Sequence, residues 1–532
     1  MIAIVFLTLV WGSTGAAATL FENLGTLHHP ISTTSEQTQR FFDQGLRLTY
    51  AFNHEEAIRS FEEAARLDPR APMPYWGIAL ALGPNINAEL SKDRERRAIE
   101  AIRQARSRLA QASDAERAYI DALSTRYLSN RKSSRTTLDR LYAGAMREVW
   151  SRYPEDSDAG VLFAEALMDL RPWDFWTPEG RPKAGTEEIL ATLEAVLSRT
   201  PDHPGACHFY IHAVEASPAP ERALPCAERL PGLMPGAGHL VHMPAHIYAK
   251  MGKYHDSAER NAEAARADER YLANAQPSRD YAEGYYTHNL HFLWSSLMME
   301  GRSAESLAAA QSLLATIGEA EARKDRMKEH YLATRLYALI RFGRWEELLK
   351  EPPPPKGLRL LEGIWRLGRG LGLAATGRLP GAAGEHVVLA GLTKHIRRTR
   401  AREEKVERDL LKVAERMLAA ELAARQQRYE EAVKALKAAA KAEQSLQDFE
   451  PPLWPLSVRQ YLGSLLLLAH RAAEAELEYR ADLKGFPENG WALFGLGQAL
   501  KAQRKDDEAS EVHARFEKAW AHADVTLAAS RF

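Results

Sequence analysis

Apolar residues recur along this chain at the spacing of α-helices. Ala, Leu, Glu and Arg dominate nearly every segment, and the alternating Val, Ile and Thr runs that favour strands are almost absent. Near the C-terminus one set of apolar and small positions recurs after 34 residues, with Leu462, Gly463, Leu466 and Ala475 followed by Leu496, Gly497, Leu500 and Ala509. A fixed period of this length is typical of stacked helix-turn-helix units. We therefore predict an all-α fold.

The N-terminal part resembles the tetratricopeptide repeat (TPR) family. Aromatic, small and proline residues have the family's spacing at Phe41, Gly45, Ala57, Phe61, Ala64 and Pro69. Small side chains at Gly45 and Ala57 would let two helices cross at short range, and Pro69 would end the second helix. The resemblance is strong over residues 38–71 and 456–521 and weaker between them. It implies a TPR-like solenoid that is irregular in the middle.

Two Pro-rich stretches interrupt the helical pattern, one at residues 172–182 and one at 351–356. The consecutive prolines of the second stretch favour a stiff, extended connector. We expect a domain boundary there, between an N-terminal solenoid at 33–350 that carries the histidines described below and C-terminal repeats at 356–532.

The first 18 residues have the pattern of a signal peptide. An apolar run from Ile2 to Trp11 is followed by small residues up to Ala18, although no Lys or Arg precedes the run. An uncleaved anchor and a misplaced start codon are the alternatives. We expect residues 1–18 to be removed and the protein to be periplasmic or secreted. No later run approaches the roughly 18 apolar residues of a spanning helix, so we expect no transmembrane segment in the mature chain.

Charge and cysteine content narrow the choice of partners. The 70 Lys and Arg residues nearly balance 71 Asp and Glu residues, so no global field attracts polyanions and nucleic acid is not an expected partner. The most basic stretch, residues 394–402, runs into two glutamates and indicates a solvated helix face. Cys207 and Cys226 could pair in an oxidising compartment or remain unpaired in the core.

Histidines are concentrated in the middle of the chain, where nine of the 18 fall within residues 203–291. His208 and His212 form an i, i+4 pair, which places both on one helical face. His242 and His246 form a second such pair, each 34 residues after its counterpart. The two pairs therefore occupy equivalent repeat positions.

Further histidines extend this pattern, since His288 and His291 lie 49 residues after His239 and His242. In the TPR family these positions of the first helix line the concave groove. Neighbouring helices pack at roughly 8–10 Å between axes, close enough for imidazoles of adjacent helices to share a metal ion. Pro244 predicts a kink or a helix restart inside the second pair. The predicted ligands are His208, His212, His239, His242, His246, His288 and His291, with a metal-free polar groove as the alternative.

The donor set narrows the choice of metal. Six or seven imidazoles exceed one tetrahedral sphere, so we expect two ions, or one ion with spare histidines. Imidazole suits copper, zinc, iron and nickel. Abundant His and few Cys in an exported protein favour copper, and three-plus-three imidazoles resemble the coupled dicopper sites of oxygen-handling proteins. Zinc and iron stay open.

The histidine pairs do not form a zinc-protease motif, because Phe209 stands where that motif places its general-base Glu. Glu215, three residues after His212, is the candidate for binding metal or moving protons, with a surface Glu as the alternative. Glu283 is a weaker candidate. His28 could fold back onto the cluster from near the mature N-terminus. The neighbouring aromatic residues could form core or line a pocket for an aromatic substrate: Tyr210, Tyr285, Tyr286 and Trp294.

Together these patterns favour an exported TPR protein with a polyhistidine metal centre, redox-active with oxygen and a small organic substrate. A copper-dependent oxidase or oxygenase is one form that it could take. The alternatives are a non-enzymatic scaffold whose groove binds a peptide or protein partner, and a metal storage or delivery protein. No phosphate-binding loop or Ser-His-Asp order stands out in the sequence.

Overall fold

The computed structural model describes residues 18–128, 133–274, 279–394, 402–446 and 449–531. Helices and short turns make up these residues, and no strand occurs among them. The all-α prediction is therefore confirmed. The chain divides into two compact units, of which the first is Met1–Phe175 with Ala184–Ala206 and the second is Trp176–Lys183 with Cys207–Phe532. All of the expected signal peptide but Ala18 lies outside the described residues.

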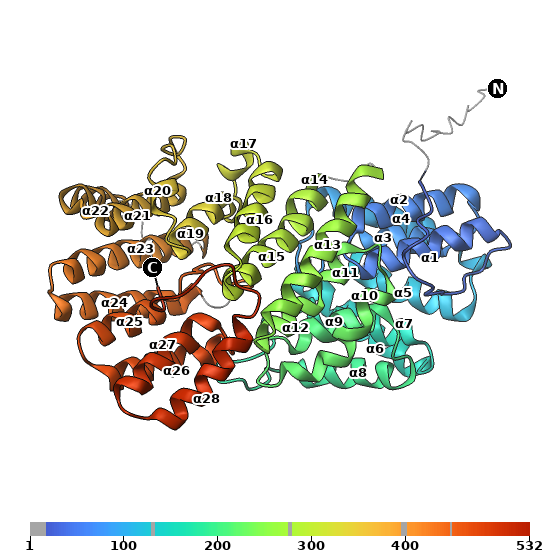
Figure 1. The fold of residues 1–532 in the computed structure, drawn as a ribbon. Coiled ribbons are helices and arrows are strands. Elements are labelled where there is room, and N and C mark those ends of the chain that lie inside the picture. The colour runs from blue at the N-terminus through green and yellow to red at the C-terminus, as the bar shows by residue number, and fades with distance from the viewer. Residues whose placement is uncertain (1–17, 129–132, 275–278, 395–401, 447–448, 532) are drawn as a thin grey trace, which may run out of the picture. The chain divides into compact units, whose positions relative to one another are not determined.

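The first unit is a series of antiparallel helices, each packed on its neighbour along the chain (Figure 1). Its helices are α1 (Glu36–Tyr50), α2 (His54–Leu67), α3 (Met73–Ala81), α4 (Lys92–Arg106), η1 (Leu109–Gln111), α5 (Asp114–Leu128), α6 (Arg135–Arg152), α7 (Ser157–Met168) and α8 (Thr186–Arg199). The helix α9 (Pro204–Val214) leads from this unit into the second.

The second unit continues with pairs of helices and several short segments. Its first half comprises η2 (Pro220–Ala223), α10 (Leu224–Leu233), α11 (Gly238–His242), α12 (Pro244–Lys250), α13 (Tyr254–Asn274), α14 (Arg279–Tyr281), the π-helical turn η3 (Ala282–Tyr286), α15 (Thr287–Glu300), α16 (Ser303–Thr316), α17 (Glu319–Ala322), α18 (Arg326–Leu332), α19 (Thr334–Arg341) and α20 (Trp345–Leu348). Its second half comprises α21 (Arg359–Ala375), α22 (Leu379–Lys394), α23 (Arg402–Arg425), α24 (Tyr429–Glu443), η4 (Gln444–Leu446), α25 (Val458–Leu468), α26 (Ala472–Gly485), α27 (Gly490–Ala502) and α28 (Asp506–Ala519).

The close crossing of helices depends on glycines that face an aromatic ring. Phe61 on α2 is fully buried, and a β-carbon at Gly45 on α1 would lie 2.5 Å from its ring. A β-carbon at Gly77 on α3 would lie 2.6 Å from the same ring. Contacts this short are not tolerated between carbon atoms, so both positions require glycine for the three helices to pack.

The same arrangement recurs in the second unit. Tyr479 on α26 is buried between Gly463 on α25 and Gly495 on α27, where added β-carbons would again collide with the ring. Gly495 provides the close approach. A β-carbon at Gly497, the glycine that the 34-residue repeat matched to Gly463, would lie 3.9 Å from Val512, which is an ordinary contact. An aromatic residue of one helix wedged between glycines of its two neighbours is therefore a repeated packing unit of this chain.

The proline run at residues 351–356 lies inside the second unit. It connects α20 to α21, and these two helices pack against each other. The division into compact units instead falls around the other Pro-rich stretch and the start of α9. The domain boundary expected at the proline run stays a prediction.

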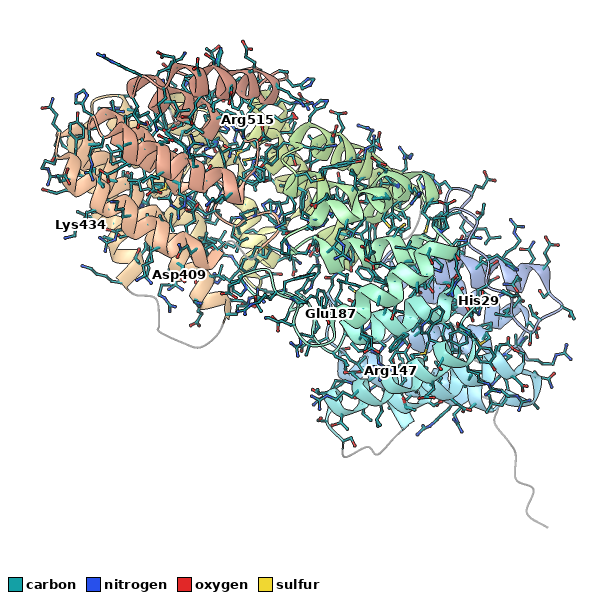
Figure 2. The ribbon with its side chains drawn as sticks, turned by 90° about the horizontal axis from the view of Figure 1, so that it is seen from below. His29, Arg147, Glu187, Asp409, Lys434 and Arg515 are labelled. Atoms are coloured by element: carbon teal, nitrogen blue, oxygen red, sulfur yellow. The ribbon has the colours of Figure 1, made fainter. Side chains whose placement is uncertain are left out.

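Charges of both signs alternate over the helix surfaces. Arg147 on α6 pairs with Glu188 at 2.8 Å, and Arg515 on α28 pairs with Glu488 at 2.6 Å (Figure 2). Such exposed pairs contribute little to stability, typically about 0–1 kcal/mol each. Over the described part of the chain, no helix has both the length and the apolar character needed to cross a bilayer.

Candidate metal centre

The seven predicted histidines all lie on helices of the second unit or on the end of α9 that belongs to it. Their positions are His208 and His212 on α9, His239 and His242 on α11, His246 on α12, and His288 and His291 on α15. As the sequence predicted, the helix stops before Pro244 and restarts there, because proline cannot donate the helical hydrogen bond at that point. This restart separates His242 from His246 while keeping both on one side.

Six of the seven imidazoles gather in two groups of three. The first triad is His208, His212 and His239, and the second triad is His242, His246 and His288. Within each triad, one nitrogen from every ring lies within 4.8 Å of the others. Tetrahedral coordination at about 2.0–2.1 Å needs nitrogens a little over 3 Å apart, so small movements would bring each triad around one ion.

The two triads are direct neighbours. The ring centroids of His212 and His246 are 5.6 Å apart, and those of His239 and His242 are 5.8 Å apart. The first triad takes ligands from two helices, α9 and α11, and the second takes them from three, α11, α12 and α15. The arrangement therefore offers two adjacent three-imidazole sites.

Burial corrects one sequence-based expectation. The histidines were expected to line an open concave groove, but five of the six triad residues are 3% exposed or less. Only His288 is partly accessible among them. The cause is a long-range contact, since the segment after η4 brings Glu450 against His246. The two sites are enclosed in the interior of the second unit.

Hydrogen bonding determines which nitrogen of His242 is free to bind metal. Asn261 donates its amide NH₂ to the Ser257 carbonyl at 2.7 Å, so its amide oxygen is the atom that faces His242 at 2.6 Å. An amide oxygen can only accept, so Nδ1 of His242 carries the proton. In the neutral ring, Nε2 of His242 then carries a lone pair, and this lone pair points into the second triad.

The same argument applies to His246. Its Nδ1 donates to a Glu450 oxygen at 2.7 Å and lies 2.6 Å from an oxygen of Glu215. Nε2 of His246 consequently faces Nε2 of His242 at 2.9 Å. Two lone pairs at this distance repel each other unless a cation, either a proton or a metal ion, lies with them.

Glu215, the predicted proton carrier, lies behind the rings. One of its oxygens is 3.0 Å from Nδ1 of His212 in the first triad, and the other is 2.6 Å from Nδ1 of His246 in the second. One buried carboxylate thus bridges both triads from the side away from the Nε2 atoms. Carboxylates in this position orient ligating imidazoles and raise their basicity. Its role in proton transfer stays a prediction.

Most of these rings are held in the neutral form that binds metals. Burial, with neighbouring imidazoles, lowers the pKa of His212, His239 and His242 well below the usual range. It lowers the pKa of His288 to about 3. His246 differs, because the carboxylates of Glu215 and Glu450 outweigh the effect of burial and raise its pKa to about 10. A metal ion at the second triad would replace the proton on His246.

His291 lies apart from both triads. Its ring stacks on Trp294 at 5.3 Å and approaches His330 of α18 at 5.7 Å. His288 and His291 are three positions apart on α15, so their side chains diverge by about 60° around the helix, and only His288 faces His242. His330 was missed by sequence reasoning because it is a lone histidine outside the repeated spacing.

The other candidate residues of the sequence pair with charged groups, pack on neighbouring rings or lie in the core. Glu283 pairs with Arg279 and Lys328, away from the triads. Tyr285 packs against His239 with ring centroids 4.9 Å apart. Cys207 and Cys226 are buried and not joined to each other by a disulfide.

No family model and no curated protein matches the sequence. Among solved structures, the human IFIT1 dimer with m7Gppp-AAAA is 13% identical, with 91% of this chain and 90% of that chain covered and a TM-score of 0.33. The Cut9 and Hcn1 hetero-tetramer of the APC/C is 13% identical, with 91% and 76% covered and a TM-score of 0.32. The P58(IPK) TPR domain is 12% identical, with 88% and 99% covered and a TM-score of 0.22.

The chain has a TPR-like fold. This conclusion rests on the helix pairs and on the glycine and aromatic packing described above.

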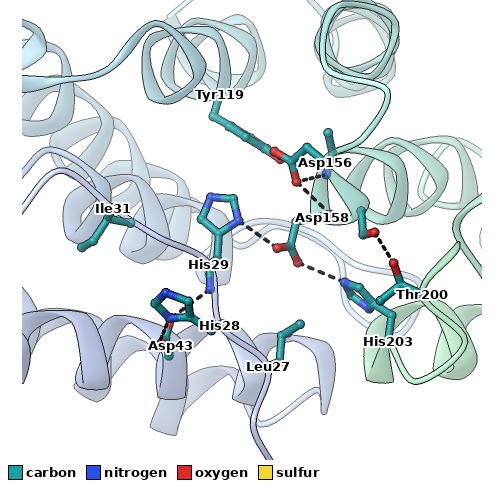
Figure 3. Close-up of polar contacts among 12 residues, drawn as sticks. Leu27, His28, His29, Ile31, Asp43, Tyr119, Asp156, Asp158, Thr200 and His203 are labelled. Atoms are coloured by element: carbon teal, nitrogen blue, oxygen red, sulfur yellow. Dashed lines mark hydrogen bonds and ion pairs between the residues drawn. The ribbon is translucent and has the colours of Figure 1, made fainter.

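A second cluster of buried histidines occurs in the first unit of this TPR-like chain (Figure 3). Asp158 on α7 accepts from Nδ1 of His29 at 2.8 Å, from Nε2 of His203 at 3.2 Å and from the Tyr50 hydroxyl at 2.6 Å. His28, which could have folded back onto the metal centre, pairs with Asp43 at 2.8 Å within this unit.

The contacts within this cluster pair donors with acceptors. Nδ1 of His203 accepts from the Ala206 amide, so Nε2 carries the proton that reaches Asp158. Asp156 accepts from the Tyr119 hydroxyl and from two amides at the start of α7. His29, Asp156 and Asp158 lie close enough to hold a metal, but their atoms are already paired with one another or with protons. The cluster is a satisfied ion-pair network that holds the N-terminal segment to α1 and α7.

Proposed function

We propose that this protein binds two transition-metal ions, one at each triad, and that copper is the preferred metal. The observation that carries the proposal is the second triad, where Nε2 of His242 and Nε2 of His246 face each other at 2.9 Å with their Nδ1 protons committed elsewhere. A metal ion placed between these nitrogens would replace the proton that they share with two coordinate bonds.

The surrounding charges support binding of cations. Glu215 is buried and Glu450 is 22% exposed at its side chain, and both contact His246. Buried carboxylates next to a ligating imidazole offset the charge of the metal and hold the ring in place. Burial of the triads also excludes water and restricts access to small ligands.

Copper is favoured by the donor set. Each triad presents imidazole nitrogens, with no thiolate among its three residues, and imidazole binds copper more tightly than zinc, nickel or iron at equal geometry. Two adjacent copper ions would supply redox chemistry with dioxygen. The proposed activity is the oxidation of a small organic donor, in which four donor molecules each lose one electron and one proton while one dioxygen is reduced to two waters.

Residues of this chain would have distinct parts in that activity. The six triad histidines hold the ions, and Glu215 orients one ligand of each triad. Because its carboxylate contacts both His212 and His246, it would hold these two ligands at a fixed separation when the metal ions change charge. We also propose export, on the strength of the apolar N-terminal sequence.

Elemental analysis of the purified full chain tests this function. We expect up to two copper ions per chain after loading with copper, and consumption of oxygen when a phenolic donor is added. A negligible content of Cu, Zn, Fe, Ni and Mn would contradict the proposal and favour a TPR-like scaffold for a peptide or protein partner. Bound metal without oxygen consumption would contradict catalysis and favour storage or delivery.

A further inference from the structure

A cavity of about 80 Å³ in the second unit reaches the second triad. Residues of α12, α13 and α15 form one side of it, and the segment that contains Glu450 forms the other. His246 is part of its lining, so the cavity touches a predicted metal ligand directly. This volume suits a molecule built on a single ring better than a peptide.

Phe292 is the wall that the cavity shares with the second triad. Its ring lines the cavity and also packs on all three imidazoles, with centroid distances of 4.9 Å to His242, 4.7 Å to His246 and 5.4 Å to His288. A molecule in the cavity would therefore lie one aromatic ring away from the triad.

The rest of the lining combines aromatic and thioether side chains with prolines and with four polar residues, Ser295, Ser296, Ser457 and Gln460. Phe449, Trp454 and Phe486 contribute rings, and Met298 and Met299 contribute polarizable side chains. Aromatic rings and methionine sulfur pack favourably on the faces and edges of an aromatic ligand. This composition favours a planar apolar molecule over a sugar or an amino acid.

Two polar features refine the ligand class. Lys250 and Glu450 pair with each other at 2.5 Å, so the main charges at the wall already compensate one another and favour a neutral ligand. Tyr254 is 8% exposed, and its hydroxyl makes no hydrogen bond to any described residue. That hydroxyl is itself fully buried behind the cavity surface, so a ligand would contact only the tyrosine ring.

We propose that this cavity binds a small, neutral aromatic molecule built on a single ring, for which phenol is the probe. The proposal deepens the proposed function, because it names the donor that the metal centre would oxidise. Binding itself needs no metal, since every wall of the cavity is protein.

Calorimetric titration of the metal-free full chain with phenol tests the proposal. We expect saturable binding of phenol, and binding of benzoate and benzylamine that is weaker by roughly tenfold or more, because a charge would be buried without compensation. Ser295→Phe fills the cavity from α15 and should weaken phenol binding by roughly tenfold or more. Ser510→Phe adds the same ring to an exposed position of α28 and should leave binding unchanged.

Toluene, a neutral ring of similar size, should bind with an affinity similar to that of phenol, because the walls contact the ring and not its substituent. Absence of saturable phenol binding, or equal binding by the wild-type and Ser295→Phe proteins, would overturn the proposal. Metal content is measured separately, so a chain that binds phenol but no copper would refute the metal centre alone, and a chain that binds copper but no phenol would refute the cavity alone.

Discussion

Each unit of this chain contains a cluster of histidines in its interior. The two clusters differ in what the ring nitrogens face. In the first unit, His29 and His203 direct N–H groups at Asp158, so donors meet an acceptor. In the second unit, His242 and His246 direct their Nδ1–H groups outward to Asn261 and to carboxylates, so their Nε2 atoms face each other and share one proton or one metal ion. In the first arrangement, protein groups alone pair the ring nitrogens. In the second, a proton or a metal ion must lie between the facing nitrogens.

The comparison teaches that the orientation of buried imidazoles says more about metal binding than their number. His29, Asp156 and Asp158 are as close to one another as the members of a triad. Their proximity is explained by ion pairs that would have to break before a metal could bind. In the triads, nitrogens of neighbouring imidazoles face each other directly, at 3.1 Å between His208 and His239 and at 2.9 Å between His242 and His246.

The largest expected effect comes from removing one ligand of each triad. His212→Ala combined with His246→Ala should lower copper affinity by more than roughly 100-fold, because each site loses one of three imidazoles. Copper content by elemental analysis and helicity by circular dichroism are the measurements. His291→Ala is the matched control, since it removes a buried histidine of the same unit that belongs to neither triad. An unchanged metal content in the double variant would show that the ligands are misassigned.

In the first unit, the expected effect is on stability instead. His29→Ala leaves the buried Asp158 carboxylate without its ion-pair partner, which should cost about 3 kcal/mol in the free energy of unfolding of that unit. Urea denaturation followed by fluorescence measures this loss, and metal content should equal that of wild type. If His29→Ala lost copper while keeping its stability, the contrast between the clusters would be reversed.

The stabilising effect of His29 should also depend on pH. Asp158, Asp156 and Asp43 face this residue, Tyr119 packs on it edge to face, and the carboxylates overcome the opposing effect of burial to raise its pKa from 6.5 to about 9. A raised folded-state pKa gives stability that is fully present below pH 6.5 and is lost as the pH rises through 9. The stability difference between wild type and His29→Ala should therefore shrink across this window. A difference that grows with pH would contradict the ion-pair assignment.

The smallest effect is expected for the residue that supports both triads. Glu215→Gln keeps the size of the side chain but removes its charge, and should weaken copper binding by about 10- to 100-fold without abolishing it. Competition with a chelator of known affinity measures the change. Glu283→Gln is a suitable control, because that carboxylate pairs with Arg279 and Lys328 away from the triads. A complete loss of copper in Glu215→Gln would make Glu215 a ligand.

Much of the fold could be predicted because it follows from local spacing. The 34-residue offsets predicted the helix pairs, and Pro244 predicted the helix restart between His242 and His246. These features depend on residues close in sequence, where helix geometry leaves few alternatives.

The parts that could not be predicted depend on contacts between distant segments. Glu450 lies 204 residues from His246, and no periodic pattern links them, yet their contact encloses the second triad and forms the cavity wall. The divergence of His291 from His288 is a matter of about 60° around one helix, finer than sequence spacing resolves. The satisfied network at Asp158 joins His29 to a residue 129 positions away.

Anomalous X-ray diffraction from crystals of the copper-loaded full chain tests the central claim most directly. We predict two anomalous peaks in the second unit, one among Nε2 atoms of the first triad and one among those of the second, with no peak at Asp158. Peaks at other residues, or an ordered copper-exposed crystal with no peak at either triad, would contradict the account.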